Sequence, residues 1–131
     1  MTTPLGYEIG FTYSAGNDIL TQTDNLGRTT TYEYDIMHRM VKATDPEGGV
    51  ATFDYDVRGN QSKVTNPLGY SYSFTYDKVD RLTTVMDPEE KATSLVYDMV
   101  GNITGITTPG ERTTSYAYDK NYNTVAVTDP M

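Results

Sequence analysis

The sequence predicts an all-β fold in which tandem antiparallel β-hairpins form a curled or spiralling β-strip. Three observations support this prediction. Tyr recurs every 21 residues without a gap, apolar and polar residues alternate before each Tyr, and turn-forming residues interrupt the chain twice in every period. Because the pattern runs through the whole chain, we expect one domain, residues 1–131, made of six tandem hairpins.

Two registers of the same period define the repeat. The Tyr register consists of Tyr13, Tyr34, Tyr55, Tyr76, Tyr97 and Tyr118. The Pro register consists of Pro4, Pro46, Pro67, Pro88, Pro109 and Pro130, with Asn25 in its vacant position. Asp follows the register Tyr at Asp35, Asp56, Asp77, Asp98 and Asp119, and Ser14 takes that place in the first copy. The array begins and ends near Pro-register turns, which indicates a section of a longer array.

The first strand of each hairpin is clearest at residues 70–76. Four aromatic residues there alternate with Ser and Thr, as expected of a half-buried strand with one aromatic face. Ser and Thr then occupy the opposite face, where β-favouring polar residues contact solvent.

A tight turn follows each register Tyr, for example at residues 56–60. The residue four positions after the Tyr is Asn17, His38, Gly59, Asp80 or Gly101, and these types best tolerate a left-handed backbone. The last copy has Tyr122 in this position, which predicts a turn of a different shape.

The second strand of each hairpin is exemplified by residues 82–86. Its two apolar residues, Leu82 and Val85, are three positions apart, so a flat strand would place them on opposite faces. A β-bulge, or burial of both faces, would resolve this conflict. The strand ends at an Asp/Asn-Pro-x-Gly turn, because Pro cannot donate to a β-ladder.

Composition excludes several classes of function. The 131 residues include 10 Lys and Arg against 18 Asp and Glu, a net charge of −8, with no basic cluster for nucleic acid. There is no Cys and one His, so a disulfide scaffold, a Cys-ligated metal and a thiol nucleophile are excluded. No apolar run approaches the roughly 20 residues of a transmembrane helix, so we expect no membrane insertion. We therefore expect no enzyme and no cofactor.

The unit Pro67-Leu68-Gly69 followed by Tyr76-Asp77-Lys78-Val79-Asp80-Arg81 resembles the YD repeat of the RHS family, and so does Tyr55-Asp56-Val57-Arg58-Gly59-Asn60. The resemblance covers nearly the whole chain in six copies. The family includes subunits of insecticidal toxin complexes, polymorphic toxins and teneurins. It implies a long β-strip wound into a hollow shell that encloses an effector. Six repeats are too few to enclose anything, and no terminal self-cleavage segment is recognisable.

Each candidate site residue also has a simple structural interpretation. In the Tyr-Asp pair, the Tyr packs on the aromatic face and the Asp caps the turn through its own backbone. His38 is a tolerated left-handed residue, and Tyr122 packs against a neighbour or offers a ring to a ligand. The carboxylates Asp54 and Asp56, or Glu33 and Asp35, share a strand side and could attract Ca²⁺, although the spacing of a calcium loop is absent.

The sequence therefore favours a structural function: the wall of a secreted or cell-surface shell or filament of bacterial type. A strip with one aromatic face must roll, stack or be covered. Expected partners are neighbouring repeats, an enclosed effector, or further copies that pair through the unprotected strand edges near residues 7–13 and 124–128. The alternative is a carbohydrate or cell-wall binding module that uses exposed aromatic rings.

Overall fold

The computed structural model describes residues 8–130, and its regular structure in that range consists of twelve β-strands. They are β1 (Gly10–Tyr13), β2 (Ile19–Thr23), β3 (Thr29–Tyr34), β4 (Met40–Thr44), β5 (Val50–Tyr55), β6 (Gln61–Thr65), β7 (Ser71–Tyr76), β8 (Leu82–Met86), β9 (Ala92–Tyr97), β10 (Ile103–Thr108), β11 (Arg112–Tyr118) and β12 (Thr124–Thr128). Pro4 and part of the first predicted strand edge lie outside the described residues. Residues 8–130 contain no helix long and apolar enough to cross a membrane.

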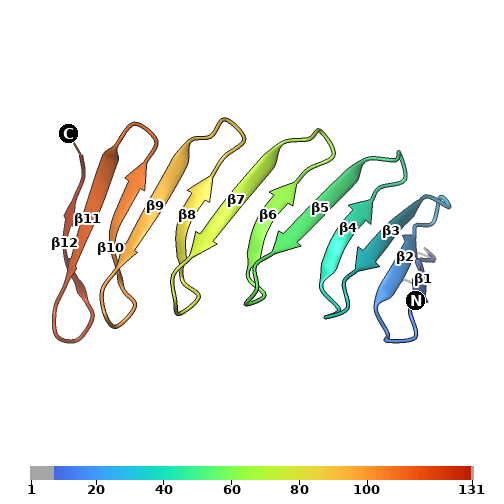
Figure 1. Cartoon of the computed structure of the whole chain (residues 1–131), viewed down its shortest axis with the longest axis horizontal. Helices are drawn as coiled ribbons and strands as arrows, with labels where there is room; N and C mark the ends of the chain where they lie inside the picture. Colours follow the sequence, from blue (N-terminus) through green and yellow to red (C-terminus); the bar gives the residue numbers. More distant parts are fainter. Residues whose placement is uncertain (1–7, 131) are drawn as a thin grey trace. The chain divides into compact units, whose positions relative to one another are not determined.

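The strands follow one another in the sheet in the order of the chain, and neighbouring strands are antiparallel (Figure 1). The predicted all-β class of tandem hairpins is therefore confirmed. By its contacts, the chain divides into two compact units. Unit 1 contains residues 1–55 and 64–70, and unit 2 contains residues 56–63 and 71–131. Hairpins β1–β2 and β3–β4 belong to unit 1, and β7–β8, β9–β10 and β11–β12 belong to unit 2.

A β-bulge resolves the three-residue spacing of the apolar positions in five of the hairpins. In the β7–β8 hairpin, Phe74 pairs with Val85 and Tyr76 pairs with Leu82, with a register shift just before Tyr76. The extra residue, Thr83, lets Leu82 and Val85 face the same side as the aromatic residues. The same shift precedes the register Tyr in β1–β2, β3–β4, β9–β10 and β11–β12. The expectation of a bulge is confirmed.

Burial is partial throughout. No hydrophobic side chain among the described residues is buried, and Gly105 is the one residue of residues 8–130 in the buried class. Five of the six register Tyr side chains are half-buried, whereas Tyr13 in β1 is 53 % exposed. Each unit is therefore a single-layered sheet whose aromatic side chains keep some contact with water, so neighbouring strands supply most of the packing.

Candidate interaction site at the tyrosine end of the hairpins

The strands meet at two kinds of turn. We call the turns that join the two strands of a hairpin the Tyr-end turns; these are residues 14–18, 35–39, 56–60, 77–81, 98–102 and 119–123. The Pro-end turns join one hairpin to the next; these are residues 24–28, 45–49, 66–70, 87–91 and 108–112. The Tyr-Asp motif lies at the Tyr-end turns, so its chemistry is described there first.

The Asp of the motif holds the turn through its carboxylate. In the turn 77–81, Asp77 Oδ1 accepts the backbone N–H of Val79 at 2.9 Å and that of Arg81 at 3.0 Å. The backbone closes the same turn, because the Asp77 N–H donates to the Arg81 carbonyl at 2.9 Å. Asp35, Asp56, Asp98 and Asp119 make the corresponding pairs of bonds, and the Ser14 hydroxyl makes them in the first copy.

These contacts favour the ionised carboxylate. The hydrogen bond from the Arg39 side chain lowers the pKa of Asp35, and the hydrogen bond from the Asn102 side chain lowers the pKa of Asp98. The side-chain hydrogen bond from Asn123 lowers the pKa of Asp119 in the same way. A carboxylate that accepts several N–H groups is a poor proton donor or acceptor at neutral pH, so its chemistry is that of a turn cap.

The fourth residue of every Tyr-end turn has a positive φ. The values are 95° at Gly59 and 100° at Gly101, and they lie between 61° and 70° at Asn17, His38 and Asp80. Tyr122 has φ 64°, its N–H donates to the Asp119 carbonyl at 3.1 Å, and the turn closes like the others. The prediction of a different shape for the last turn was wrong. The backbone bonds of the Asp119 cap impose the left-handed conformation even on a bulky residue.

The Pro-end turns share this geometry; the sequence predicted a tight turn here but not the Asp or Asn cap. Asp87 Oδ1 accepts the N–H of Glu89 and that of Lys91, both at 2.9 Å, and Glu90 has φ 62°. Asp24, Asp45 and Asn66 cap the other turns of this kind. The turn 108–112 differs, since Gly110 and Glu111 both have positive φ. The signal was available in the sequence as Asp or Asn at alternating spacings of 10 and 11 residues.

In four of the six copies, the hydroxyl of the register Tyr bonds to the preceding hairpin. Tyr76 Oη donates to the Gln61 carbonyl at 2.8 Å, and Tyr97 Oη donates to the Leu82 carbonyl at 2.7 Å. Tyr55 and Tyr118 make the same contact with the carbonyl 15 residues earlier, at 2.8 and 2.7 Å. Sequence reasoning assigned the ring to packing and missed this bond. The sequence pattern that indicates this bond is the presence of Tyr, and never Phe, in all six copies of the register.

The backbone ladder explains why those carbonyls accept a side chain. Strands β8 and β9 pair at three positions next to their Pro-end turn, from Met86 with Ala92 to Thr84 with Ser94. The ladder stops before it reaches Leu82, whose carbonyl then accepts the Tyr97 hydroxyl. In unit 1, β4 and β5 likewise pair at three positions and leave the Met40 carbonyl to Tyr55. The register Tyr thus satisfies a carbonyl where two hairpins separate.

A repeat of this construction can be compared with known families. The RHS Repeat profile matches residues 13–50, and the Teneurin YD-shell profile matches residues 50–130. The second match alone covers more than half of the chain. The chain belongs to the RHS/YD-repeat family.

Solved structures with the same fold include proteins of Tc toxins. The crystal structures of TcdB2-TccC3-Cdc42 and TcdB2-TccC3 match with TM-scores of 0.78 and 0.75, each at 19 % identity over 92 % of this chain. The Tc holotoxin pore of Photorhabdus luminescens matches with a TM-score of 0.75 at 19 % identity over 91 % of this chain. This chain spans 7 % of the length of each of those chains, and the likeness shows the fold. No curated protein matches the chain.

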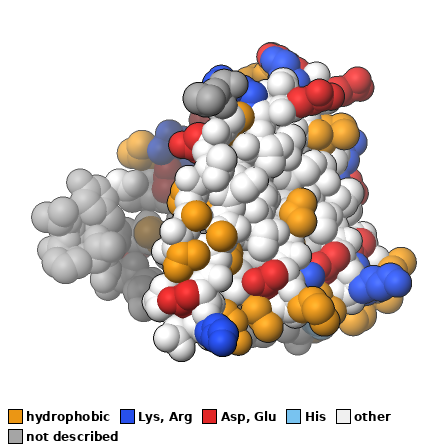
Figure 2. Space-filling model, turned by 90° about the vertical axis from the view of Figure 1, so that its left-hand side faces the viewer, with side chains coloured by type: hydrophobic (Ala, Val, Ile, Leu, Met, Phe, Trp, Pro, Cys, Tyr) orange, Lys and Arg blue, Asp and Glu red, His pale blue; other side chains and the backbone are white. Residues whose placement is uncertain are grey.

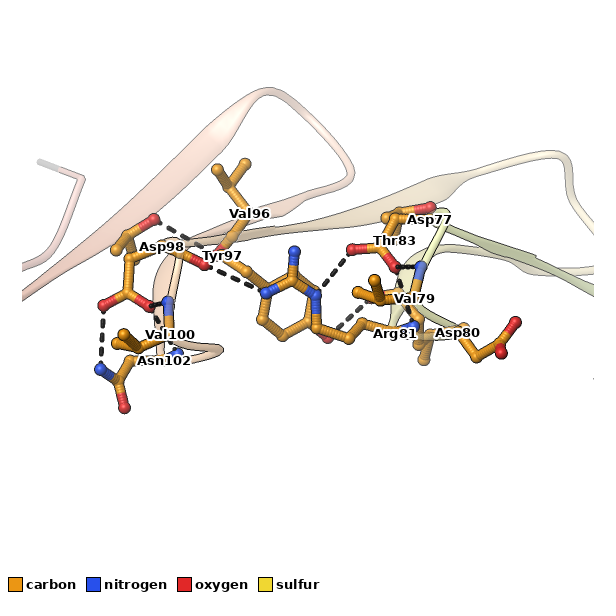
Figure 3. A network of polar contacts seen from close by, with 12 residues as sticks. Asp77, Val79, Asp80, Arg81, Thr83, Val96, Tyr97, Asp98, Val100 and Asn102 are labelled. Carbon is orange, nitrogen blue, oxygen red and sulfur yellow. Dashed lines mark hydrogen bonds and ion pairs between the residues drawn. The ribbon is translucent and has the colours of Figure 1, made fainter.

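Side chains also link consecutive YD-repeat turns in unit 2 (Figure 3). The Arg81 guanidinium lies between two turns: Nε donates to Asp77 Oδ2 at 2.7 Å and Nη1 donates to the Asp98 carbonyl at 3.0 Å. Its central carbon lies 4.7 Å from the centre of the Tyr97 ring, which adds a cation–π contact. One turn earlier, Arg58 Nη2 donates to the Asp77 carbonyl at 2.7 Å and pairs with Asp80 at 3.1 Å.

Unit 1 has comparable links. Arg39 lies over the Tyr55 ring at 4.6 Å, and His38 Nδ1 lies 2.7 Å from Asp18 Oδ2. His38 thus occupies the left-handed turn position and also contacts the preceding turn. These contacts, like those of unit 2, hold one YD repeat to the next along the Tyr end.

The carboxylates considered as Ca²⁺ ligands have other partners in the structure. Glu33 pairs with Lys42 at 2.7 Å, and Asp35 and Asp56 cap their turns. Within residues 8–130, no group of three or more His, Asp or Glu side chains could hold a metal ion. Tyr122 remains 60 % exposed at the last Tyr-end turn. The arrangement at the Tyr end supports contact between repeats, with one exposed aromatic ring beside it.

Proposed function

We propose that this chain is a non-catalytic structural segment, part of the wall of a secreted or cell-surface shell or filament built from YD repeats. The observation that carries this proposal is the use of the repeat signature. The Tyr hydroxyls donate to carbonyls of the preceding hairpin, and the Asp carboxylates close the turns. The recurring polar groups are thereby used to join hairpins. The fold likeness to toxin-complex proteins supports a wall that neighbouring repeats, and in a longer chain an enclosed effector, would contact.

A wall segment should join further repeats through its end strands. Among the described residues, β1 pairs with β2 and β12 pairs with β11, so each end strand has one hydrogen-bonded neighbour. All five residues of β12 are exposed, and they include no Pro and no Lys. An unpaired edge of this kind can bind another strand. Copies would then associate end to end, as a ring if the curvature closes and as a filament otherwise.

The test is light scattering and electron microscopy at micromolar concentration across a salt series. We expect association that increases with salt, because the net charge of −8 repels copies at low salt. Val127→Lys places a charge on the end strand and should abolish end-to-end association. Val96→Lys in the internal strand β9 is the matched control, since Val96 and Val127 are 57 % and 56 % exposed. A monomer at every salt and concentration would contradict the proposal.

Carbohydrate binding is a second candidate because of Tyr122, which is 60 % exposed and is fixed by its turn. A rigid exposed ring can stack on a sugar. A glycan array with the wild-type chain and Tyr122→Ala tests this function. Binding that is lost in Tyr122→Ala would support it, and no binding to any glycan would rule it out.

A further inference from the structure

One position of the aromatic face is polar in a single copy of the repeat. In the second strand of the other five hairpins this position holds an apolar residue: Ala43, Val64, Val85, Ile106 and Val127. The first copy holds Gln22, which pairs with Phe11 on one side and with Thr30 on the other, so it lies on the aromatic face. A polar residue that interrupts an otherwise apolar position points to a use outside the repeat itself.

Gln22 lines a hollow of about 310 Å³ in unit 1. Thr30 of β3 lines it too, and two successive Pro-end turns contribute the other lining residues: Asp24, Arg28, Pro46 and Glu47. Charged side chains gather at such turns, and Figure 2 shows them mainly in its upper and lower parts, where Figure 1 places the Pro-end and Tyr-end turns. Ligand pockets usually measure about 300–1,000 Å³, so this hollow has room for one small ligand.

Two of the charges at the hollow neutralise each other. Arg28 Nε donates to Asp24 Oδ2 at 2.7 Å, and Arg28 Nη2 lies 2.7 Å from the same oxygen. The hydrogen bond to Asp24 and, to a smaller extent, the charge of Glu47 raise the pKa of Arg28, so Glu47 also lies near the guanidinium. Within residues 8–130, however, Glu47 makes no ion pair, and no hydrogen bond of Arg28 Nη1 is observed.

Further polar groups at the hollow are available to a ligand. The Gln22 side-chain oxygen accepts the Tyr32 hydroxyl at 3.3 Å, which leaves the Gln22 amide N–H groups without a partner in the described part of the chain. The Thr30 hydroxyl is likewise without a partner there. The hollow therefore offers N–H donors from Gln22 and Arg28, one hydroxyl, and one unpaired carboxylate as acceptor.

This set of groups suits an uncharged ligand that both donates and accepts hydrogen bonds. An anion would meet the carboxylates of Asp24 and Glu47, and the guanidinium that could attract it is already paired. A cation would find one unpaired carboxylate, that of Glu47, with the Arg28 guanidinium beside it. Hydroxyl groups can donate to the carboxylate and accept from the N–H groups without either conflict.

We infer that this hollow binds one unit of a neutral sugar. The sugar hydroxyls would donate to Glu47 and accept from Gln22 and Arg28, and the Pro46 ring would contact the C–H groups of the sugar. The site belongs to unit 1, whereas Tyr122 belongs to unit 2. It therefore depends neither on the Tyr122 ring nor on the wall function.

The experiment follows the backbone-amide NMR spectrum of the whole chain during titration with the methyl glycosides of glucose, galactose, mannose and N-acetylglucosamine, one at a time. We expect at least one of them to shift the signals of residues 22–30 and 45–49 until they saturate. In Gln22→Val the dissociation constant should rise by at least about tenfold, as expected when a hydrogen bond to the ligand is lost. Val occupies the same position at Val64 and Val85, so this variant should fold.

Glu47→Leu and Glu89→Leu are a matched pair, because both residues occupy the third position of a Pro-end turn, where Leu26 and Leu68 also occur. Glu47→Leu should raise the dissociation constant by at least about tenfold. Glu89→Leu removes the same charge outside the hollow and should bind the sugar like wild type. The dispersion of the NMR spectrum establishes that each variant is folded.

Several outcomes would overturn the inference. It is wrong if none of the glycosides shifts the signals of residues 22–30 and 45–49, or if shifts occur only elsewhere. It is also wrong if Gln22→Val binds like wild type, or if Glu47→Leu and Glu89→Leu weaken binding equally, since net charge would then control binding. Tyr122→Ala should bind like wild type, and a loss of binding in this variant alone would assign the sugar to the exposed ring.

Discussion

The two ends of the hairpins hold neighbouring strands together by different means. At the Pro end the backbone ladder between hairpins is complete, as between β8 and β9, where three residue pairs follow the turn. At the Tyr end this ladder is absent, and a Tyr hydroxyl with an Arg side chain bridges the gap, as Tyr97 and Arg81 do. Backbone pairing tolerates many side chains, whereas a side-chain bridge requires one residue type.

This difference accounts for the pattern of the repeat. The Tyr register is occupied by Tyr in all six copies, and in four of them the hydroxyl bonds to the preceding hairpin, a contact that Phe could not make. The Pro-end turns vary more: the turn 108–112 lacks the Asp cap, yet β10 and β11 still pair at four positions. Sequence regularity in this chain therefore marks the places where side chains replace backbone pairing.

The largest expected loss of stability follows from removing the whole side chain of a register Tyr. Tyr76→Ala removes a half-buried ring and the hydroxyl that satisfies the Gln61 carbonyl. We expect a loss of about 2–3 kcal/mol in the free energy of unfolding, below the range for fully buried aromatic residues. Urea denaturation measures this value. Ser73→Ala, on the opposite face of β7, is the control and should change little; equal effects would remove the distinction between the faces.

The strands and turns were predictable because they depend on local chemistry. Alternation around Phe74 and left-handed residues such as Gly59 identified strands and turns, and the spacing of Leu82 and Val85 indicated the bulge. The Tyr76 hydroxyl bond was not predictable in this way. It joins residues 15 positions apart in adjacent strands, and its geometry depends on where the ladder between hairpins ends.

The shape of the last turn was missed for a related reason. A Tyr at position 122 argues against positive φ on local propensity, but the backbone bonds of the Asp119 cap outweigh that preference. The stacking of Arg81 on Tyr97 was missed as well, because it depends on the distance between consecutive turns. Local signals predicted the repeat unit, and the contacts between units required the structure.

A smaller loss of stability is expected when only the hydroxyl of a register Tyr is removed. Tyr97→Phe keeps the ring over Arg81 and leaves the Leu82 carbonyl without its donor. We expect a loss of about 1 kcal/mol, typical of one hydrogen bond to a partly exposed group. Tyr116→Phe in β11 is the matched control, since no hydrogen bond of its hydroxyl is observed within residues 8–130. Identical unfolding curves for wild type and Tyr97→Phe would show that the ring alone joins the hairpins.

A substitution at a Pro-end turn should instead stabilise the chain. Glu90→Gly removes a side chain from a position with φ 62°, where Gly is unstrained. We expect the free energy of unfolding to rise by about 0.5–1 kcal/mol. The relief of backbone strain stabilises the folded chain, and the entropy that Gly adds to the unfolded chain offsets part of this gain. Thermal and urea unfolding measure the change. If Glu90→Gly destabilises the chain, the Glu90 side chain supports the turn, and positive φ costs less at this position than we expect.

The smallest expected effect concerns pH and the Tyr-end caps. The side-chain hydrogen bonds from Arg39 and Asn102 lower the pKa of Asp35 and Asp98 in the folded chain below its value in the unfolded chain. A lowered folded pKa stabilises the fold above the unfolded pKa, about 3.9 for Asp, and this contribution is lost as pH falls through the folded pKa. The urea midpoint should therefore stay level from neutral pH to about pH 5 and decline below about pH 4.

In Asp98→Asn the amide can still cap the turn, as Asn66 does at the Pro end, so the decline should be shallower than in wild type. Asp54→Asn, which removes a strand carboxylate, controls for the loss of one charge. A decline of the same steepness in wild type and Asp98→Asn would mean that the Tyr-end carboxylates are not the groups that titrate.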